Sequence, residues 1–293
     1  MNYQQFVELM KEKVAKELGE GMSLETHTTL KNNGRERIGL TITDNHFNIF
    51  PTIYLEEFYH QFLNGISVED IVSSLLELYH EVKYEHIGQV SILKDFHSVQ
   101  SKLVPKLINA EKNKTFLQTV PHIHYLDFAI VFYLLFQVDE CGTATIPITN
   151  SLVDFWKVVP KDLYALALNN APLLLPASFK PMNVVIKELI GEYAHITQSE
   201  ETVLFVLTNQ LGSFGASCLL YKDILSQIAV QLGENYYILP SSIHEVLIIP
   251  ESKSPSLEHL NEMILEINET LLDVEEYLSD HAYYFDHKTM MIE

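Results

Sequence analysis

The run FAIVFYLLF, residues 128–136, is the longest uninterrupted apolar segment of the chain. Its residues are mostly aromatic or β-branched, which favours a buried strand over a helix at this length. The turn sequence Asp139-Glu140-Cys141-Gly142 follows, and residues 143–149 predict a second strand. Together these segments predict an antiparallel hairpin in the middle of the chain.

Similar patterns occur on both sides of this hairpin. Residues 37–42 and 47–50 predict two strands around the turn residues Asp44 and Asn45. Towards the other end, strands are predicted at 203–207, 216–220, 236–239 and 244–249, with Gly212 and Gly215 between the first two. Residues 86–120 leave strand and helix open. The pattern predicts an α+β fold of repeated antiparallel hairpin-plus-helix units, with helices covering the sheet faces.

Apolar residues at helical spacing predict the helices between these strands. Phe6, Met10 and Val14 fall on one face of a first helix over residues 3–18. Further helices are predicted at residues 54–62, 68–82, 151–156, 160–169, 184–193 and 223–232. A connector punctuated by prolines runs from Pro172 to Pro181, so we expect two closely packed α+β parts, residues 1–175 and 176–293.

Residues 257–278 predict a long C-terminal amphipathic helix. Its apolar residues step alternately by three and four positions, which is a heptad pattern. The segment from residue 251 to the last residue carries 11 acidic and two basic side chains, so the outer face must be acidic. The pattern favours a helix that covers an open sheet face of its own chain, and the alternative is pairing with a protein partner or self-association through this helix.

Composition excludes several classes of protein. The 293 residues are 47% hydrophobic and 20% charged, which is typical of a folded globular chain. A net charge of −20 opposes general binding to nucleic acid, and no apolar run approaches the roughly 20 residues that cross a bilayer. The first residues lack the features of a signal peptide, and Cys141 and Cys218 cannot form a disulfide framework. We therefore expect an acidic protein in the cytoplasm.

The segment Pro121-His122-Ile123-His124 contains the strongest metal-like pattern. On a strand, residues i and i+2 face the same way, so His122 and His124 could bind one ion, with Asp127 joining through a turn. No further metal motif accompanies them, and a chain with 13 histidines contains such spacings by chance. The alternative is a strand entry at which the imidazoles hydrogen-bond to neighbouring backbone.

A second polar group lies at Ser241, Ser242, His244 and Glu245. Hydroxyl, imidazole and carboxylate are the groups of acyl transfer and acid–base catalysis. However, no G-x-S-x-G turn is present, and on a strand His244 and Glu245 face opposite ways. We favour a turn whose hydroxyls satisfy backbone groups. If the two parts pack face to face, His122 and His244 could meet.

Several segments carry a family resemblance: FPTIYL at 50–55, LDFAIVFY at 126–133, LTN at 207–209 and ILPSSIHEV at 238–246. They resemble a bacterial family known only as a domain of unknown function and, more distantly, the uncharacterised YtpQ-like proteins. The resemblance implies a cytoplasmic α+β protein. It implies no activity, cofactor or functional residue.

These observations leave two main functions open. The first is a non-catalytic binding or protein-interaction module without a cofactor, because no complete catalytic motif is present and the 257–278 helix has an acidic exterior. The second is a metal-dependent hydrolase that uses His122, His124 and His244. The family likeness also allows a regulatory or defence-related accessory of mobile bacterial elements.

Overall fold

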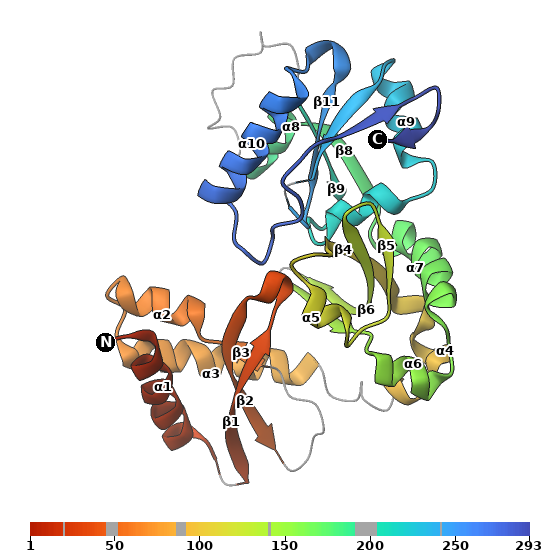
Figure 1. Cartoon of the computed structure of the whole chain (residues 1–293). Coiled ribbons are helices and arrows are strands. Elements are labelled where there is room, and N and C mark those ends of the chain that lie inside the picture. Colours follow the sequence, from red (N-terminus) through yellow and green to blue (C-terminus); the bar gives the residue numbers. More distant parts are fainter. Residues whose placement is uncertain (20, 45–51, 86–91, 140–141, 191–203, 241) are drawn as a thin grey trace. The chain divides into compact units, whose positions relative to one another are not determined.

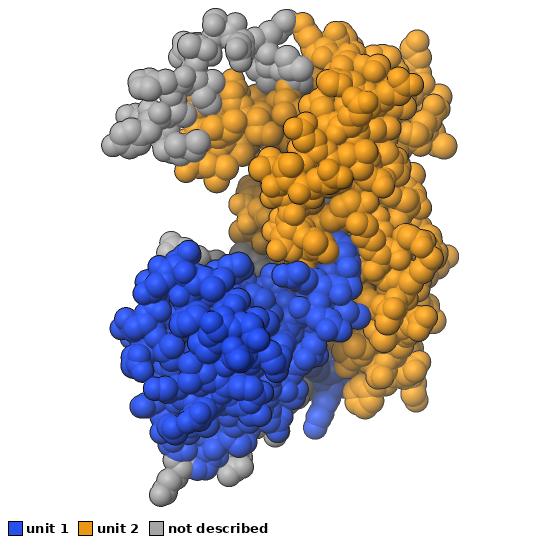
Figure 2. Space-filling view, turned by 60° about the vertical axis from the view of Figure 1, so that its left-hand side comes forward, with its two compact units in different colours: residues 1–98 blue, residues 99–293 orange. Residues whose placement is uncertain are grey.

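The computed structural model describes the chain except for residues 20, 45–51, 86–91, 140–141, 191–203 and 241 (Figure 1). It divides the chain into two compact units, Met1–Ser98 and Val99–Glu293 (Figure 2). Both units combine helices with antiparallel sheets, which confirms the predicted α+β class. None of the described helices has the length and apolar character needed to span a membrane.

The first unit is built on a three-stranded antiparallel sheet in the order β1-β2-β3. The strands are β1 (Met22–Leu30), β2 (Glu36–Asp44) and β3 (Thr52–Tyr54). The helices are α1 (Tyr3–Glu17), α2 (Glu56–Leu63) and α3 (Val68–Glu85), with short turns at η1 (Asn32–Gly34) and η2 (Ile92–Lys94). The predicted strand at 37–42 is confirmed as part of β2, and β1 is a strand that the sequence pattern missed. The strand expected at 47–50 lies outside the described residues.

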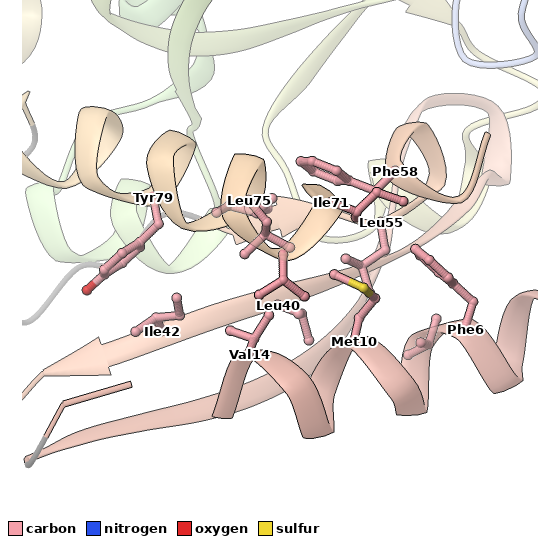
Figure 3. Close-up of a cluster of buried hydrophobic side chains, with 13 residues drawn as sticks. Phe6, Met10, Val14, Leu40, Ile42, Leu55, Phe58, Ile71, Leu75 and Tyr79 are labelled. Carbon is pink, nitrogen blue, oxygen red and sulfur yellow. The ribbon is translucent and has the colours of Figure 1, made fainter. Parts of the chain in front are cut away.

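One hydrophobic core holds this unit together (Figure 3). Phe6, Met10 and Val14 come from one face of α1, as their spacing predicts, and all are fully buried. They pack with Leu40 of β2 and Leu75 of α3. The helices therefore cover the apolar face of the sheet and leave its other face to polar residues.

The second unit contains two sheets, of which the first is centred on the predicted apolar strand. That strand is β6 (Phe128–Asp139), which pairs with β4 (Leu103–Asn109) on one side and with β5 (His122–Tyr125) and β7 (Gly142–Pro147) on the other. The β6–β7 pairing confirms the predicted hairpin. The helices of this part of the unit are η3 (Gln100–Lys102), α5 (Lys114–Leu117), α6 (Asn150–Trp156) and α7 (Pro160–Leu174), and α4 (Phe96–Val99) spans the unit boundary in the sequence.

The other sheet has six antiparallel strands in the order β13-β12-β10-β11-β9-β8. They are β8 (Ala177–Pro181), β9 (Phe205–Asn209), β10 (Tyr236–Leu239), β11 (Val246–Pro250), β12 (Tyr283–Asp286) and β13 (Met291–Ile292). Its helices are α8 (Met182–Ile190), η5 (Gly215–Leu220), α9 (Ile224–Leu232), η6 (Glu251–Lys253) and α10 (Leu257–Thr270). α10 packs on this sheet (Figure 1), because its Leu260 and Ile264 share a core with Leu239 and Ile249.

Two predicted elements are wrong. Residues 216–220 form the 3-10 helix η5 instead of a strand, and the hydroxyl oxygen of Ser217 accepts the backbone N–H of Leu107 on the outer side of β4. The long C-terminal helix ends at Thr270 instead of 278, because the following chain returns to the sheet as β12. Tyr277 already forms a bridge with Ser242 before that strand begins.

The expected boundary after residue 175 falls inside the unit Val99–Glu293, between its four-stranded and six-stranded sheets. The hydroxyl of Tyr221 donates to the carbonyl of Leu175, which joins the two parts across this junction. Repeated hairpin-plus-helix units are not confirmed, because the three sheets differ in strand order among the described residues.

Candidate functional site

His122 and His124 lie side by side on β5, as the i, i+2 spacing predicts. Their ring centroids are 5.4 Å apart and the rings are nearly perpendicular. Nδ1 of His122 lies 3.1 Å from the carbonyl oxygen of Val120, which can only accept a hydrogen bond. In the neutral ring the proton therefore sits on Nδ1, and the lone pair of Nε2 stays available.

The two histidines line a cavity of about 360 Å³. The α5 segment supplies the rest of its wall, including Leu117 and Gln118 and the ion pair between Glu111 and Lys114. The cavity thus combines an apolar surface with two imidazoles and one neutralised charge pair. Such a lining suits a small ligand or a weakly held cation.

Asp127 does not join the two histidines. Its carboxylate accepts hydrogen bonds from the hydroxyls of Tyr283 and Ser279, the latter at 3.2 Å. Burial and this carboxylate raise the pKa of the Tyr283 hydroxyl. Asp127 therefore connects the β5–β6 turn to the segment before β12, and we interpret it as a structural link between the two sheets.

The same segment contains a Ser-Asp-His grouping that the sequence reading missed. Ser279 Oγ lies 3.3 Å and Asp280 Oδ1 lies 3.0 Å from the same ring nitrogen, Nδ1 of His281. A catalytic relay needs the nucleophile and the carboxylate on opposite ring nitrogens. The letters SDH at 279–281 could have drawn attention to this group, but its geometry does not form a triad.

His244 is held by backbone groups. Its Nδ1 accepts the N–H of Phe214 at 3.4 Å, and the ring stacks on that phenylalanine. Burial and the nearby Lys106 ammonium lower the pKa of His244, which favours the neutral ring. Nε2 is 4.0 Å from Oε1 of Glu276, at the limit of an ion pair. The lone pair that a metal ligand or general base would need is already used by Phe214.

Lys106 is a second group that the sequence reading missed. It lies on β4 with only 8% of its surface exposed, and its Nζ is 4.4 Å from the Phe214 ring centroid and 5.4 Å from that of Tyr133. An ammonium between two aromatic faces is stabilised by cation–π interactions. Burial raises the pKa of Tyr133 to about 12. The feature of the sequence that could have indicated this site is the single lysine within the mostly apolar strand LVPKLIN.

The remaining predicted residues act as turn residues where they are described. The Oγ of buried Ser242 accepts the backbone N–H of His244 at 3.0 Å. Burial raises the pKa of Glu245, and the neighbouring Glu276 carboxylate adds to this effect. Ser241 lies outside the described residues. This arrangement agrees with hydroxyls that satisfy backbone groups around Pro240.

Two separate places thus hold the predicted site residues: the cavity beside β5, and the junction of the two sheets. In the part of the chain that the structure describes, the ring of His244 contacts Phe214 in the turn before η5 and lies 4.0 Å from Glu276, and neither His122 nor His124 shares a contact with it. Among the described residues, no group of three or more His, Cys, Asp or Glu side chains is arranged to hold a metal ion.

The fold and these sites define an α+β protein of antiparallel sheets in which most candidate groups are engaged in internal hydrogen bonds. A family model matches residues 3–287, and the chain belongs to this family of unknown function, DUF5688. Comparison with curated proteins found no match, and comparison with solved structures found none either. The likeness to YtpQ-like proteins stays a prediction.

Proposed function

We propose that this protein is a non-catalytic protein-interaction module that binds a basic partner through the outer face of α10 and the turn after it. The proposal rests on the observation that leucine side chains of this segment are exposed to solvent among glutamate carboxylates. We define the acidic face as the exposed leucine and glutamate side chains of residues 257–271, namely Leu257, Glu258, Glu262, Leu265, Glu266, Glu269 and Leu271.

The inner side of α10 is already occupied. Leu260 and Ile264 are fully buried against the chain's own sheet, and Leu278 further along is also fully buried. These three residues of the predicted heptad pattern are therefore used for internal packing, whereas Leu257 and Leu271 of the same pattern are exposed. A partner would therefore reach the outer side of the segment.

The outer side of this segment exposes three leucines among its glutamates. Leu257 and Leu265 are each 45% exposed, and Leu271 is 81% exposed. Leu257 and Leu265 are eight positions apart, so they lie about two turns apart along the helix and about 80° apart around its axis. Spaced apolar side chains on one side of a helix are typical of a helix that contributes anchors to a protein interface.

Charge decides which partner we propose. Glu258, Glu262, Glu266 and Glu269 follow the helix, and residues 257–280 contain no lysine or arginine. A second copy of this segment would bring like charges together, which disfavours self-association here. A partner segment with basic residues around an apolar anchor fits both features.

A defined probe tests the proposal. Fluorescence anisotropy would measure the Kd of a labelled amphipathic peptide of lysine and leucine for the intact chain. We expect Leu265→Ser, and separately Glu262→Lys with Glu266→Lys, to weaken binding about tenfold or more, since about 1.4 kcal/mol corresponds to a tenfold change.

The controls remove one exposed leucine and reverse one exposed acidic residue away from α10. Leu173→Ser on α7 removes a leucine that is as exposed as Leu271, at 81%, and Asp162→Lys reverses an exposed acidic residue on the same helix. Both should leave the Kd unchanged. Equal losses in the control variants would show that the peptide responds only to the overall charge of the protein, and this would overturn the proposal. No loss of binding in the α10 variants would also overturn it.

The metal-dependent hydrolase that uses His122, His124 and His244 is the second candidate. It is favoured by the histidine pair in the cavity beside β5. It lacks support from His244, whose Nδ1 accepts a backbone N–H. Metal content of the purified protein separates the two candidates, as set out below.

A further inference from the structure

We propose that two copies of this chain associate through the free edge of β1, so that their three-stranded sheets join antiparallel about Thr26. The β1 edge is defined as the side of Met22–Leu30 that faces away from β2. This inference is independent of the partner proposed for α10.

β1 is a long strand with one paired side. All nine of its residues pair with β2, and within the described part of the chain no strand pairs with its other side. A free edge exposes backbone N–H and C=O groups that can bind another strand. The ladder with β2 holds β1 extended, so little conformational entropy would be lost when a further strand is added.

The sequence of β1 lacks the usual protection against such pairing. MSLETHTTL contains no proline, glycine, lysine or arginine, and Thr26, Thr28 and Thr29 have high strand propensity. Other terminal strands are shorter or protected. β3 and β13 have three and two residues, and β8 carries Lys180 and Pro181. β1 is thus the long unprotected edge among the strands that the structure describes.

The polar side chains of Glu25 and His27 on β1 can pair with the same two side chains of a second copy of the chain. Glu25 and His27 are exposed on the same face, with Nε2 of His27 3.2 Å from Oε2 of Glu25. In an antiparallel pair centred on Thr26, position 25 of one copy lies opposite position 27 of the other. Each carboxylate, which accepts hydrogen bonds, would then lie beside an imidazole of the second copy, which can donate one, and complementary cross-strand pairs stabilise a sheet.

The same register pairs the whole strand. Met22 of one copy would face Leu30 of the other, so all nine residues would contribute to the new ladder. The two-fold arrangement uses the same surface on both copies and therefore closes as a dimer. A different peptide would need side chains that match Glu25 and His27 in the same register, so we propose a second copy of this chain as the partner.

Sedimentation velocity and light scattering on the intact chain test this inference. We expect a concentration-dependent species of twice the 33.6 kDa chain mass. Glu25→Lys should weaken the dimer about tenfold or more, because it places a lysine opposite His27 of the second copy. His27→Glu should do the same by placing two carboxylates opposite each other.

The double variant Glu25→Lys with His27→Glu restores opposite charges across the pair, and we expect it to restore the dimer. Glu8→Lys on α1, an exposed position away from β1, is the charge control and should keep the dimer. Circular dichroism of each variant checks that it is folded. A wild-type chain that stays monomeric, or a dimer that persists in Glu25→Lys, would overturn the proposal.

Discussion

Substitution of Asp127 by alanine should destabilise the second unit strongly. The Asp127 carboxylate accepts hydrogen bonds from the hydroxyls of Ser279, which is fully buried, and Tyr283, which is 7% exposed. Alanine would leave both hydroxyls without this acceptor. A buried polar group that loses its partner costs about 1–3 kcal/mol. Ser279 Oγ keeps its contact with Nδ1 of His281, so we assign the cost to the Tyr283 hydroxyl and expect a loss of about 1–3 kcal/mol in unfolding free energy.

Related variants separate the hydrogen bonds from the loss of packing. Asp127→Asn keeps one acceptor oxygen and should cost about half as much as alanine. Tyr283→Phe removes one donor and keeps the Ser279 contact. Because Asp127→Ala and Tyr283→Phe remove the same bond, their combination should cost less than the sum of the single changes, by at least about 0.5 kcal/mol.

Urea unfolding followed by tryptophan fluorescence is the assay. Trp156 is the only tryptophan and lies on α6, so the signal reports on the unit Val99–Glu293. An Asp127→Ala variant within about 0.5 kcal/mol of the wild type, the range of ordinary surface substitutions, would refute the reasoning. Strict additivity in the double variant would also refute it.

Three further predictions concern the same unit. Gly215→Ala should lower the unfolding free energy of the unit by at least about 2 kcal/mol, because a Cβ at this position would collide with Thr208 Oγ1 and the carbonyl oxygen of His244. A urea midpoint equal to that of the wild type would contradict this prediction. Burial and Lys106 lower the pKa of His244 below its ordinary 6.5, so stability should fall as the pH drops from 6.5 through the lowered value. His244→Asn should flatten that part of the pH profile, and an unchanged slope would show that another group titrates. Mass spectrometry of the purified chain should find no stoichiometric zinc, and one zinc per chain that is lost in His122→Ala would support the hydrolase instead.

The candidate site was predictable only in part. The spacing of His122 and His124 correctly placed both rings on one side of a strand, because the side-chain period of a strand is two residues. The carboxylate expected beside them, Asp127, turns instead to Tyr283, which lies 156 residues further along the chain. Nothing in the local pattern identifies so distant a partner.

Local patterns determined most of the helices and strands. The four-residue spacing of Phe6, Met10 and Val14 indicates α1, and the apolar run 128–136 indicates β6, because short-range periodicity reflects which side of an element is buried. The composition also shows an acidic, folded chain. These properties depend on residues close together in the sequence.

The tertiary structure alone decided where apolar segments without a clear period would go. Residues 216–220, a short mostly apolar run after a glycine turn, are predicted as a strand, yet they form a 3-10 helix beside β4, where Ser217 satisfies the backbone N–H of Leu107. The predicted heptad pattern continues through Leu271, but α10 ends at Thr270. The helix ends there because the following chain hydrogen-bonds to the sheet as β12. Such outcomes depend on hydrogen-bond partners that lie far apart in the sequence, and packing brings those partners together only in the folded chain.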